Sequence, residues 1–315
     1  MKRVLYLSHA PPDVYEIIRR EAPADVDLVT LERDDDDAER HAQIATCEVV
    51  IVAATPLRKA LIDAARALEL VHHQGVGWQD TTDHEALRAR GIPLALTPEG
   101  TTVGVAEHTV LLMLAALKRL PFADRELRDG RFHINALRPV SRELCGLTVG
   151  YVGMGRIARA VATRLAPFGT RGIYFDPDVA EGGEVRRVSF DVLLAESDIV
   201  TLHVPLTPAT RHMIGQRELA AMKRGAYLIN TSRGGLVDET ALVAALESGH
   251  LGGAALDVFE HEPMPAGHPL SRLANVTLTP HIAAGTRDAL ATKMRALFAN
   301  VERFYRGEPL ANRVF

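Results

Sequence analysis

Short apolar and β-branched runs alternate with amphipathic stretches along almost the whole chain. A buried strand followed by a helix, repeated many times, is typical of parallel sheets covered by helices on both faces. We therefore expect an α/β fold with two doubly wound parallel-sheet domains. The predicted strands are residues 4–7, 27–31, 49–52, 70–73 and 94–96, and then 148–152, 172–175, 199–202, 226–229, 253–256 and 276–278.

Two interruptions of this pattern predict the domain boundaries. Thr97-Pro98-Glu99-Gly100 precedes a long apolar helix expected from about Thr102 to Arg119, and Ala284-Gly285 precedes a last helix that runs to about Arg306. A helix that follows the final strand can return to the first domain. We expect one domain of residues 1–98 and 286–315, a second domain of residues 99–285, and a cleft between them.

The composition is that of a water-soluble globular protein, with 47% hydrophobic residues, 24% charged residues and a formal net charge of −4. Basic residues form no long stripe, so we expect no nucleic-acid partner. The apolar run at the N-terminus stops at Ser8, too early for a signal sequence. The stretch from Val103 to Leu117 contains Glu107 and His108, and its length and polarity predict no membrane span.

Two cysteines and one acidic run are the candidates for metal or redox sites. Cys47 and Cys145 lie in different segments without ligand spacing, which predicts no disulfide, no metal site and a cytoplasmic location. The run from Asp34 to Asp37 allows a metal site or a solvated helix N-terminus. The helix dipole favours the second interpretation.

A glycine-rich turn follows the predicted strand 148–152. Residues 153–158 read G-x-G-x-x-A, in which Gly153 allows a tight turn, Gly155 lets backbone approach a pyrophosphate, and Ala158 permits close helix–strand packing. The same turn occurs in methyltransferases. Asp176 ends the next strand, where a carboxylate can bind the adenosine ribose and repel a 2′-phosphate. Together these features predict NAD in preference to NADP, unless Asp176 merely ends the strand.

Three residues that suit hydride and proton transfer follow three later strands: Arg233, Glu262 and His281. The carboxyl ends of parallel strands meet at one edge of a sheet, so these side chains can converge. Arg233 can bind a carboxylate with its planar guanidinium, and His281 can exchange a hydroxyl proton. Glu262, if it contacts the ring, would stabilise the imidazolium. Each residue also has an ordinary structural interpretation.

The chain resembles the D-isomer-specific 2-hydroxyacid dehydrogenase family, and the similar segments span nearly all of it in the family's order. The segments are Gly75-Val76-Gly77, Val105-Ala106-Glu107-His108-Thr109, and residues 148–157, 202–207, 230–238, 255–263 and 279–285.

This resemblance implies a Rossmann NAD domain, a flavodoxin-like substrate domain and NAD-dependent oxidation of a small D-2-hydroxy acid, or reduction of a glyoxylate- or hydroxypyruvate-like 2-keto acid. Arg233 then binds substrate, His281 is the acid/base, and Glu262, which directly precedes a proline, pairs with it. The backbone of Val76 and Gly77 holds the substrate carboxylate, and the helix from Thr102 forms a homodimer arm. The residues expected at the cofactor are Gly153, Met154, Gly155, Arg156, Ile157, Asp176, His203, Val204, Pro205, Thr231, Ser232, Arg233, Asp257 and His281.

Departures from the family pattern leave the substrate open. Trp78-Gln79-Asp80 stands where many relatives have an aromatic-Asp pair, and Thr101 stands where they often have Asn. His72 and His73 could contact a substrate or simply end a strand. Alternatives are therefore an enzyme of this fold that oxidises phosphite or another unusual substrate, or a protein that binds NAD(H) as a sensor. The substrate, the direction and the pathway are not defined by the sequence.

Overall fold

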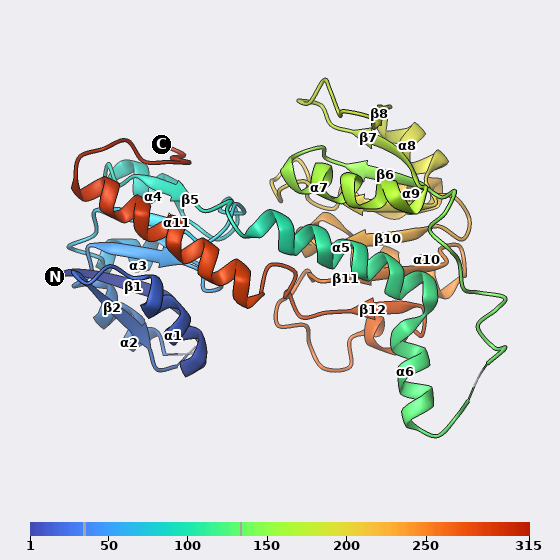
Figure 1. Ribbon diagram of the computed structural model, residues 1–315, viewed down its shortest axis with the longest axis horizontal. Coiled ribbons are helices and arrows are strands. Elements are labelled where there is room, and N and C mark those ends of the chain that lie inside the picture. Colours follow the sequence, from blue (N-terminus) through green and yellow to red (C-terminus); the bar gives the residue numbers. More distant parts are fainter. Residues whose placement is uncertain (34–35, 133) are drawn as a thin grey trace. The chain divides into compact units, whose positions relative to one another are not determined.

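The computed structural model describes residues 1–33, 36–132 and 134–315, which form two compact units. Unit 1 comprises Met1–Thr101 and Gly285–Phe315, and unit 2 comprises Thr102–Ala284. In Figure 1 unit 1 is both blue and red, because the C-terminal segment returns to the N-terminal sheet. The sequence pattern predicted divisions after residues 98 and 285, and the units divide after residues 101 and 284.

Unit 1 is a parallel sheet with strand order β2-β1-β3-β4-β5. This is the order of flavodoxin-like folds, which confirms the expected architecture. The strands are β1 (Lys2–His9), β2 (Val26–Leu31), β3 (Val49–Val52), β4 (Leu70–His73) and β5 (Leu94–Leu96). The helices are α1 (Pro12–Glu21), α2 (Asp37–Ile44), α3 (Lys59–Ala64), α4 (His84–Ala89) and α11 (Arg287–Tyr305).

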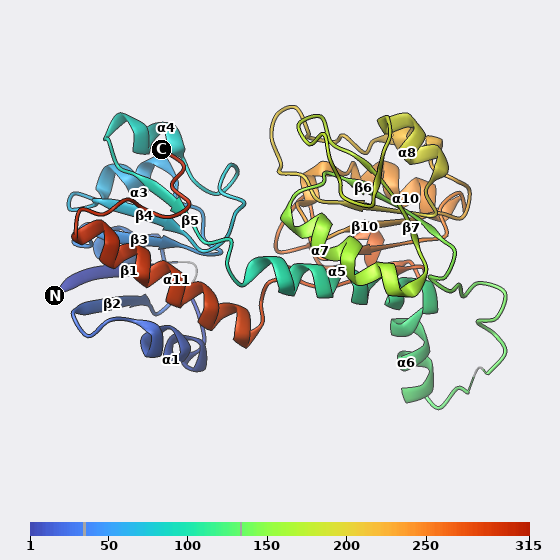
Figure 2. The same cartoon turned by 45° about the horizontal axis from the view of Figure 1, so that its top comes forward.

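Alternation along the central strand β1 separates two hydrophobic cores. Val4 and Tyr6 pack with residues of α1 and α11, whereas Leu5 and Leu7 pack with residues of α2, α3 and α4. Successive strand side chains point to opposite faces, so an all-apolar run requires helices on both. Figure 2 shows α11 lying along the sheet on the same face as α1, with which it is in contact.

Unit 2 is a seven-stranded parallel sheet with the order β12-β11-β10-β9-β6-β7-β8. From β8 to β11 this is the Rossmann order, and β12 extends it by one strand. The strands are β6 (Thr148–Val152), β7 (Arg171–Phe175), β8 (Arg186–Arg187), β9 (Ile199–Leu202), β10 (Tyr227–Asn230), β11 (Gly253–Leu256) and β12 (Val276–Leu278). The helices are α5 (Thr101–Lys118), α6 (Leu120–Arg128), α7 (Arg156–Leu165), α8 (Phe190–Glu196), α9 (Gln216–Ala221) and α10 (Glu239–Glu247), with short 3-10 turns η1 (Ala166–Phe168), η2 (Gly234–Leu236) and η3 (Pro269–Arg272).

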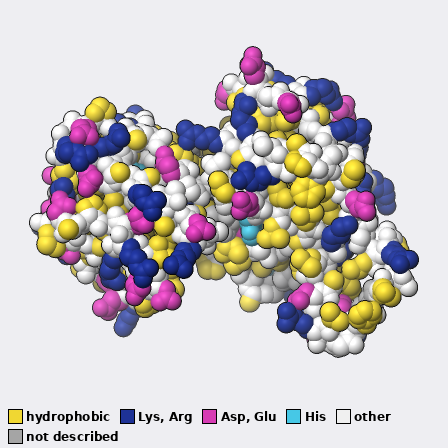
Figure 3. Space-filling view, in the orientation of Figure 1, with side chains coloured by type: hydrophobic (Ala, Val, Ile, Leu, Met, Phe, Trp, Pro, Cys, Tyr) yellow, Lys and Arg dark blue, Asp and Glu magenta, His cyan; other side chains and the backbone are white. Residues whose placement is uncertain are grey.

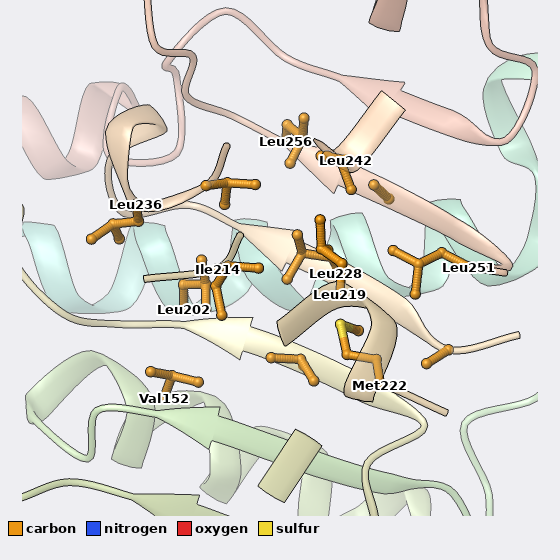
Figure 4. Packing of buried hydrophobic residues seen from close by; sticks show 14 of the residues in the cluster. Val152, Leu202, Ile214, Leu219, Met222, Leu228, Leu236, Leu242, Leu251 and Leu256 are labelled. Atoms are coloured by element: carbon orange, nitrogen blue, oxygen red, sulfur yellow. The ribbon is translucent and has the colours of Figure 1, made fainter. Parts of the chain in front are cut away.

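Figure 4 shows one of the two cores of unit 2, in which strand and helix side chains interdigitate. Val152, Leu202 and Leu228 come from the sheet, Leu219 comes from α9, and Met222 directly follows that helix. The other core packs α5 and α7 against the opposite face. Both faces of the sheet are therefore covered, which holds the strand ends in place for the loops that follow them.

The strand β8 and the helix α6 were not predicted from the sequence. β8 has only two residues, both exposed arginines, so it carries no apolar signal. α6 follows α5 directly because Arg119 adopts a left-handed backbone with φ 53°, which ends one helix and redirects the next.

The acidic run begins α2. Asp36 caps this helix, since its side chain accepts the N–H of Glu39 at 2.9 Å, so the helix interpretation holds for the part of the run that is described. Asp34 and Asp35 lie outside the described residues. Among the described residues, no group of three or more histidines, cysteines, aspartates or glutamates is arranged to hold a metal ion.

Helix α5 is long and apolar enough to cross a membrane by length and composition alone, which corrects the expectation that this stretch is too short and too polar. Half of it is buried inside the structure. Ala106, Leu112, Met113 and Leu117 belong to the second core of unit 2, so packing against the sheet accounts for the apolar character of that face.

Candidate active site

The loops after β10, β11 and β12 carry Arg233, Glu262 and His281. These strands are neighbours and run parallel, so their carboxyl ends lie at one edge of the unit 2 sheet. Ligands of open α/β sheets bind at this edge.

The His281 ring lies directly against Glu262. Nδ1 of His281 is 2.7 Å from Oε2 of Glu262, and Oε1 of Glu262 accepts the N–H of Phe259 at 3.0 Å. A carboxylate can only accept, so Nδ1 carries the proton that is shared with Glu262. The His281 side chain is 48% exposed. This orientation makes Nε2 the nitrogen that can exchange a proton with a bound molecule.

The backbone around His281 is fixed by β11. His281 has a positive φ of 54°, and its N–H donates to the carbonyl oxygen of Asp257 at 2.7 Å. A left-handed backbone is unfavourable for a histidine and persists only where its surroundings enforce it. The ring direction is therefore set by the end of the neighbouring strand.

Arg233 lies in a loop that packs tightly against the Glu262 loop. Its carbonyl oxygen accepts from Nδ2 of Asn230 at 2.9 Å, and its Nη1 donates to the carbonyl oxygen of Ser232 at 2.9 Å. A Cβ on the next residue, Gly234, would lie 1.8 Å from the carbonyl carbon of Phe259. Only glycine permits this approach, so the two loops are locked together.

The Glu262 carboxylate is held in its charged form. Burial raises its pKa, but the hydrogen bond and charge of His281, the N–H of Phe259 and the charge of Arg233 together lower the pKa below its ordinary value. A charged Glu262 accepts the hydrogen bond from Nδ1 of His281. The three residues can therefore bind a negative group and move a proton beside it.

Asp257 was expected at the nicotinamide, and the structure places its carboxylate in the protein interior with 0% exposure. Oδ1 accepts from the Thr279 hydroxyl at 2.6 Å and the Ile282 N–H at 2.9 Å, and Oδ2 accepts from the Ala283 N–H at 2.8 Å. His108 of α5 also approaches, with Nε2 3.5 Å from Oδ1. Asp257 therefore braces both sides of the loop that carries His281.

The glycine-rich turn links β6 to the N-terminus of α7. Gly153 has φ 88°, and a Cβ there would lie 2.7 Å from the carbonyl oxygen of His203. A Cβ on Gly155 would meet nothing within 4 Å, so this side of the turn is open to a ligand. Met154 and Ala158 are buried, while Arg156 is exposed and Ile157 partly buried. The turn fits a pyrophosphate bound by backbone at a helix N-terminus.

Asp176 follows β7, and its carboxylate stabilises the same turn. Oδ2 accepts the N–H of Met154 at 2.8 Å, and Oδ1 accepts the N–H groups of Asp178 at 2.9 Å and Val179 at 3.1 Å. Each carboxylate oxygen has two lone pairs, so these bonds leave acceptor capacity on Oδ2 for one ribose hydroxyl.

The remaining cofactor candidates lie after β9 and β10. The Ser232 hydroxyl donates to the carbonyl oxygen of Val204 at 2.6 Å, and the Thr231 hydroxyl contacts that of Thr109 at 2.9 Å. Burial lowers the pKa of His203 to about 3, so its ring is neutral. Pro205 is exposed next to them. These segments lie beside the glycine turn, because Gly153 packs on His203.

In unit 1, Val76 and Gly77 lie in the loop after β4. The carbonyl oxygen of Gly77 accepts from the Thr81 hydroxyl at 3.2 Å, and Val76 is exposed. Their role at the substrate stays a prediction.

The two neighbouring histidines are buried within β4, which favours the structural interpretation. His72 contacts Thr97 at 3.2 Å and Asn300 at 3.0 Å, and burial lowers its pKa to about 3. Nε2 of His73 lies 3.0 Å from the Thr81 hydroxyl. Two residues differ from the family pattern described above. Trp78 packs edge-on against His84, and Thr101 is buried at the start of α5.

Two supporting residues were missed from the sequence. His108 reaches the Thr279 hydroxyl with Nε2 at 3.0 Å, and Glu239 accepts the N–H of Glu260 at 2.9 Å. A histidine inside an otherwise apolar helix was a usable signal for the first. Glu239 looks like an ordinary first-turn acid, and only the folded loops reveal its contact.

A dinucleotide-binding domain of the Rossmann class is defined by the strand order, the open glycine turn and the carboxylate after β7. The family model of the D-isomer specific 2-hydroxyacid dehydrogenase NAD binding domain matches residues 110–283. The chain belongs to this family, and unit 2 contains its NAD-binding domain.

Individual relatives and a solved structure agree with this family assignment. A glyoxylate reductase of Korarchaeum cryptofilum is 40% identical over 84% of this chain and 82% of that protein. A D-3-phosphoglycerate dehydrogenase of Archaeoglobus fulgidus is 38% identical over 84% of this chain, which spans only 51% of that protein. The crystal structure of the TT0316 protein from Thermus thermophilus matches with a TM-score of 0.88 and 35% identity, over 99% of this chain and 100% of that one.

Proposed function

We propose that the protein is an NAD-dependent dehydrogenase that moves a hydride between nicotinamide and C2 of a small D-2-hydroxy acid or 2-keto acid. The observation that carries the proposal is the contact of 2.7 Å between His281 and Glu262, at the sheet edge that also carries Arg233 and the glycine turn. When bound, NAD supplies or accepts the hydride. The chain itself supplies the anion-binding group, the proton and the orientation.

Each residue then has a defined task. Arg233 binds the substrate carboxylate and the C2 oxygen through its planar guanidinium. During reduction, Nε2 of His281 gives its proton to the keto oxygen as the hydride reaches C2, and during oxidation it takes the hydroxyl proton back. Glu262 holds the tautomer and offsets the charge of the imidazolium. The backbone of Val76 and Gly77 is a further proposed carboxylate site.

The test is NADH consumption by the purified protein with a panel of 2-keto acids that includes glyoxylate and hydroxypyruvate. We expect turnover with at least one of them, and turnover reduced roughly 100-fold or more in His281→Ala, the usual contribution of a positioned acid/base. Phosphite with NAD forms a separate arm of the panel. Turnover of phosphite alone would replace the 2-hydroxy acid assignment, and NAD(H) binding without any turnover would favour a sensor.

We further propose a homodimer formed through α5, α6 and the segment that follows. Apolar side chains are exposed here, most strongly Phe132 at 75% and Ile134 at 71%, together with Leu111, Leu120 and Leu127. Figure 3 shows hydrophobic side chains gathered on this face of unit 2. A patch of this kind typically marks an interface. Light scattering should give the mass of two chains. In the double variant Phe132→Ser/Ile134→Ser the measured mass should shift toward that of one chain.

A cytoplasmic location is part of the same proposal, and it is supported by the cysteines. Cys47 is buried and Cys145 exposed, and both are free thiols. Free thiols are the ordinary state in a reducing compartment. Fractionation of cells that produce the protein should recover it with cytoplasmic markers, and recovery with membranes would contradict this assignment.

A further inference from the structure

A second group of acids and histidines lies behind the Glu262 loop. We call Glu239, Glu260, His268 and His212 the loop anchor. All four belong to unit 2, and none was predicted at the active site. Nε2 of His212 lies 2.5 Å from Oε1 of Glu260, so the Glu260 side chain is directed to His212 and leaves Glu262 as the acid that contacts His281.

Glu239 is the central member of the loop anchor. It is the first residue of α10 and is only 8% exposed. Its Oε1 accepts the backbone N–H of Glu260 at 2.9 Å, and its Oε2 lies 3.2 Å from Nε2 of His268. Both oxygens are therefore engaged on a carboxylate that is almost excluded from water. A buried acid is stable only with such partners.

The His268 ring lies against the second oxygen of Glu239. Its Nδ1 accepts the N–H of Leu270 at 3.4 Å at the start of η3, which leaves the proton of a neutral ring on Nε2, the nitrogen that faces Glu239. His268 thus contacts Oε2 of Glu239, while the Glu260 N–H is bound to Oε1.

The loop anchor controls where Glu262 lies. The N–H of Glu260 is bound to Glu239, and the preceding N–H, of Phe259, is bound to Oε1 of Glu262. The other side of this peptide is closed, since Gly234 leaves no space for even a Cβ against Phe259. Backbone that moved at Glu260 would therefore move the donor that orients Glu262.

Resting on the proposed function, we propose that Glu239 is a positioning residue for the Glu262–His281 pair. It holds the backbone of residues 259–260 through one hydrogen bond, so that Glu262 places its second oxygen on Nδ1 of His281. Glu239→Ala removes the acceptor and leaves the half-buried N–H of Glu260 without a partner, which shifts the loop. A displacement of about 1 Å at a catalytic group can cost roughly 100-fold in rate.

The first test is a double-mutant cycle with Glu262→Ala. Glu239→Ala should lower kcat roughly tenfold or more. In the Glu262→Ala background the same change should cost less than about twofold, because residues that act through one another are not additive. Glu239→Gln keeps an oxygen for the Glu260 N–H and should stay within about threefold of the unaltered protein. Glu247→Ala, at the exposed end of the same helix, is the matched control.

The second test needs no turnover. Proton–nitrogen correlation spectra of the imidazoles, recorded well above neutral pH, report which nitrogen of His281 carries the proton. We expect the Nδ1–H form in the unaltered protein and a shift toward the Nε2–H form in Glu262→Ala and in Glu239→Ala. Glu239→Asp, which keeps the charge at the start of α10, should show a smaller shift and serves if the alanine variant does not fold.

The outcomes separate the two proposals. A shifted tautomer in a protein without 2-keto acid turnover would support the loop anchor and reject the proposed function. An unaltered tautomer in the folded Glu239 variants, or losses of kcat that add fully to those of Glu262→Ala, would reject the positioning role.

Discussion

Asp257→Asn separates a structural role of this carboxylate from a role at the cofactor. The substitution keeps the shape of the side chain and replaces one oxygen by a donor. If Oδ1 keeps the Thr279 hydroxyl and the Ile282 N–H, the new amide faces the N–H of Ala283, where Oδ2 now accepts at 2.8 Å. Two donors then meet in a site with 0% exposure.

The cost follows from these contacts. A buried N–H without an acceptor costs about 1–3 kcal/mol, and each of the two retained bonds loses the extra strength of a charged acceptor, about 0.5–1 kcal/mol. The sum is about 3 kcal/mol. For a unit of this size it corresponds to a fall in Tm of roughly 6–12 °C.

The pH dependence gives an independent check. Burial raises the pKa of Asp257, but hydrogen bonds from His108, Thr279 and the N–H groups of Ile282 and Ala283 together lower it below 3.8. A group whose pKa is lower in the folded state contributes stability above its unfolded pKa, and this stability is lost as the pH falls through the folded value. The difference between the two proteins should therefore be full near neutral pH and shrink below about pH 3.8.

Thermal and urea unfolding at several pH values, with Asp191→Asn as a surface control on α8, provide the measurement. Asp257→Asn should unfold well below the unaltered protein, while the control should not differ. A Tm unchanged by Asp257→Asn, together with a large loss of NAD affinity, would show that the carboxylate serves the cofactor and does not brace the loop.

Three further predictions address the cofactor and the acid/base. His281→Ala should lower kcat roughly 100-fold or more and change NADH affinity little, as fluorescence titration would show; a nearly unchanged rate removes His281 from the mechanism. Asp176→Asn should lower the ratio of kcat/KM with NAD to kcat/KM with NADP roughly tenfold, because a negative charge no longer faces the 2′-phosphate. Full retention of the preference for NAD would contradict this explanation. Gly153→Ala imposes a left-handed backbone on alanine and places its Cβ 2.7 Å from the carbonyl oxygen of His203. NADH affinity, measured by the same fluorescence titration, should therefore fall at least about tenfold. A normal affinity would mean that the turn adapts.

The parts of the fold that follow from burial were predictable from the sequence. Every side chain of Val49–Val52 is buried, as are those of Ile199–Leu202, and a buried run that is apolar except for Thr201 has few alternatives to a central parallel strand. Burial could not predict β8, because Arg186 and Arg187 are exposed at the edge of the sheet and join it through their backbone alone. α6 depended on the left-handed residue at Arg119, which no sequence pattern marks.

The residues of the candidate site were predictable to the extent that strand ends define them. Arg233, Glu262 and His281 each follow a strand of one parallel sheet, which brings their loops to one edge. The choice between Glu260 and Glu262 could not come from position alone, since both follow β11 within a few residues. The structure gives the physical reason: the Glu260 side chain lies against His212, and its N–H is bound to Glu239.

The contacts of Asp257 could not be predicted from its place at a strand end. A polar residue after a parallel strand can face a ligand or face the next loop, and the sequence pattern is the same in both cases. The outcome depends on the donors that the next loop presents. Here the loop after β12 presents two adjacent N–H groups and a hydroxyl. A buried carboxylate that accepts from all three has a much lower free energy than three buried donors without an acceptor. The exposed pair of His281 and Glu262 is thus held by two buried acids, Asp257 beneath the histidine and Glu239 behind the glutamate. In the proposed function, the orientation of these two groups is therefore fixed before any substrate binds, which is the condition under which a single proton transfer contributes fully to the rate.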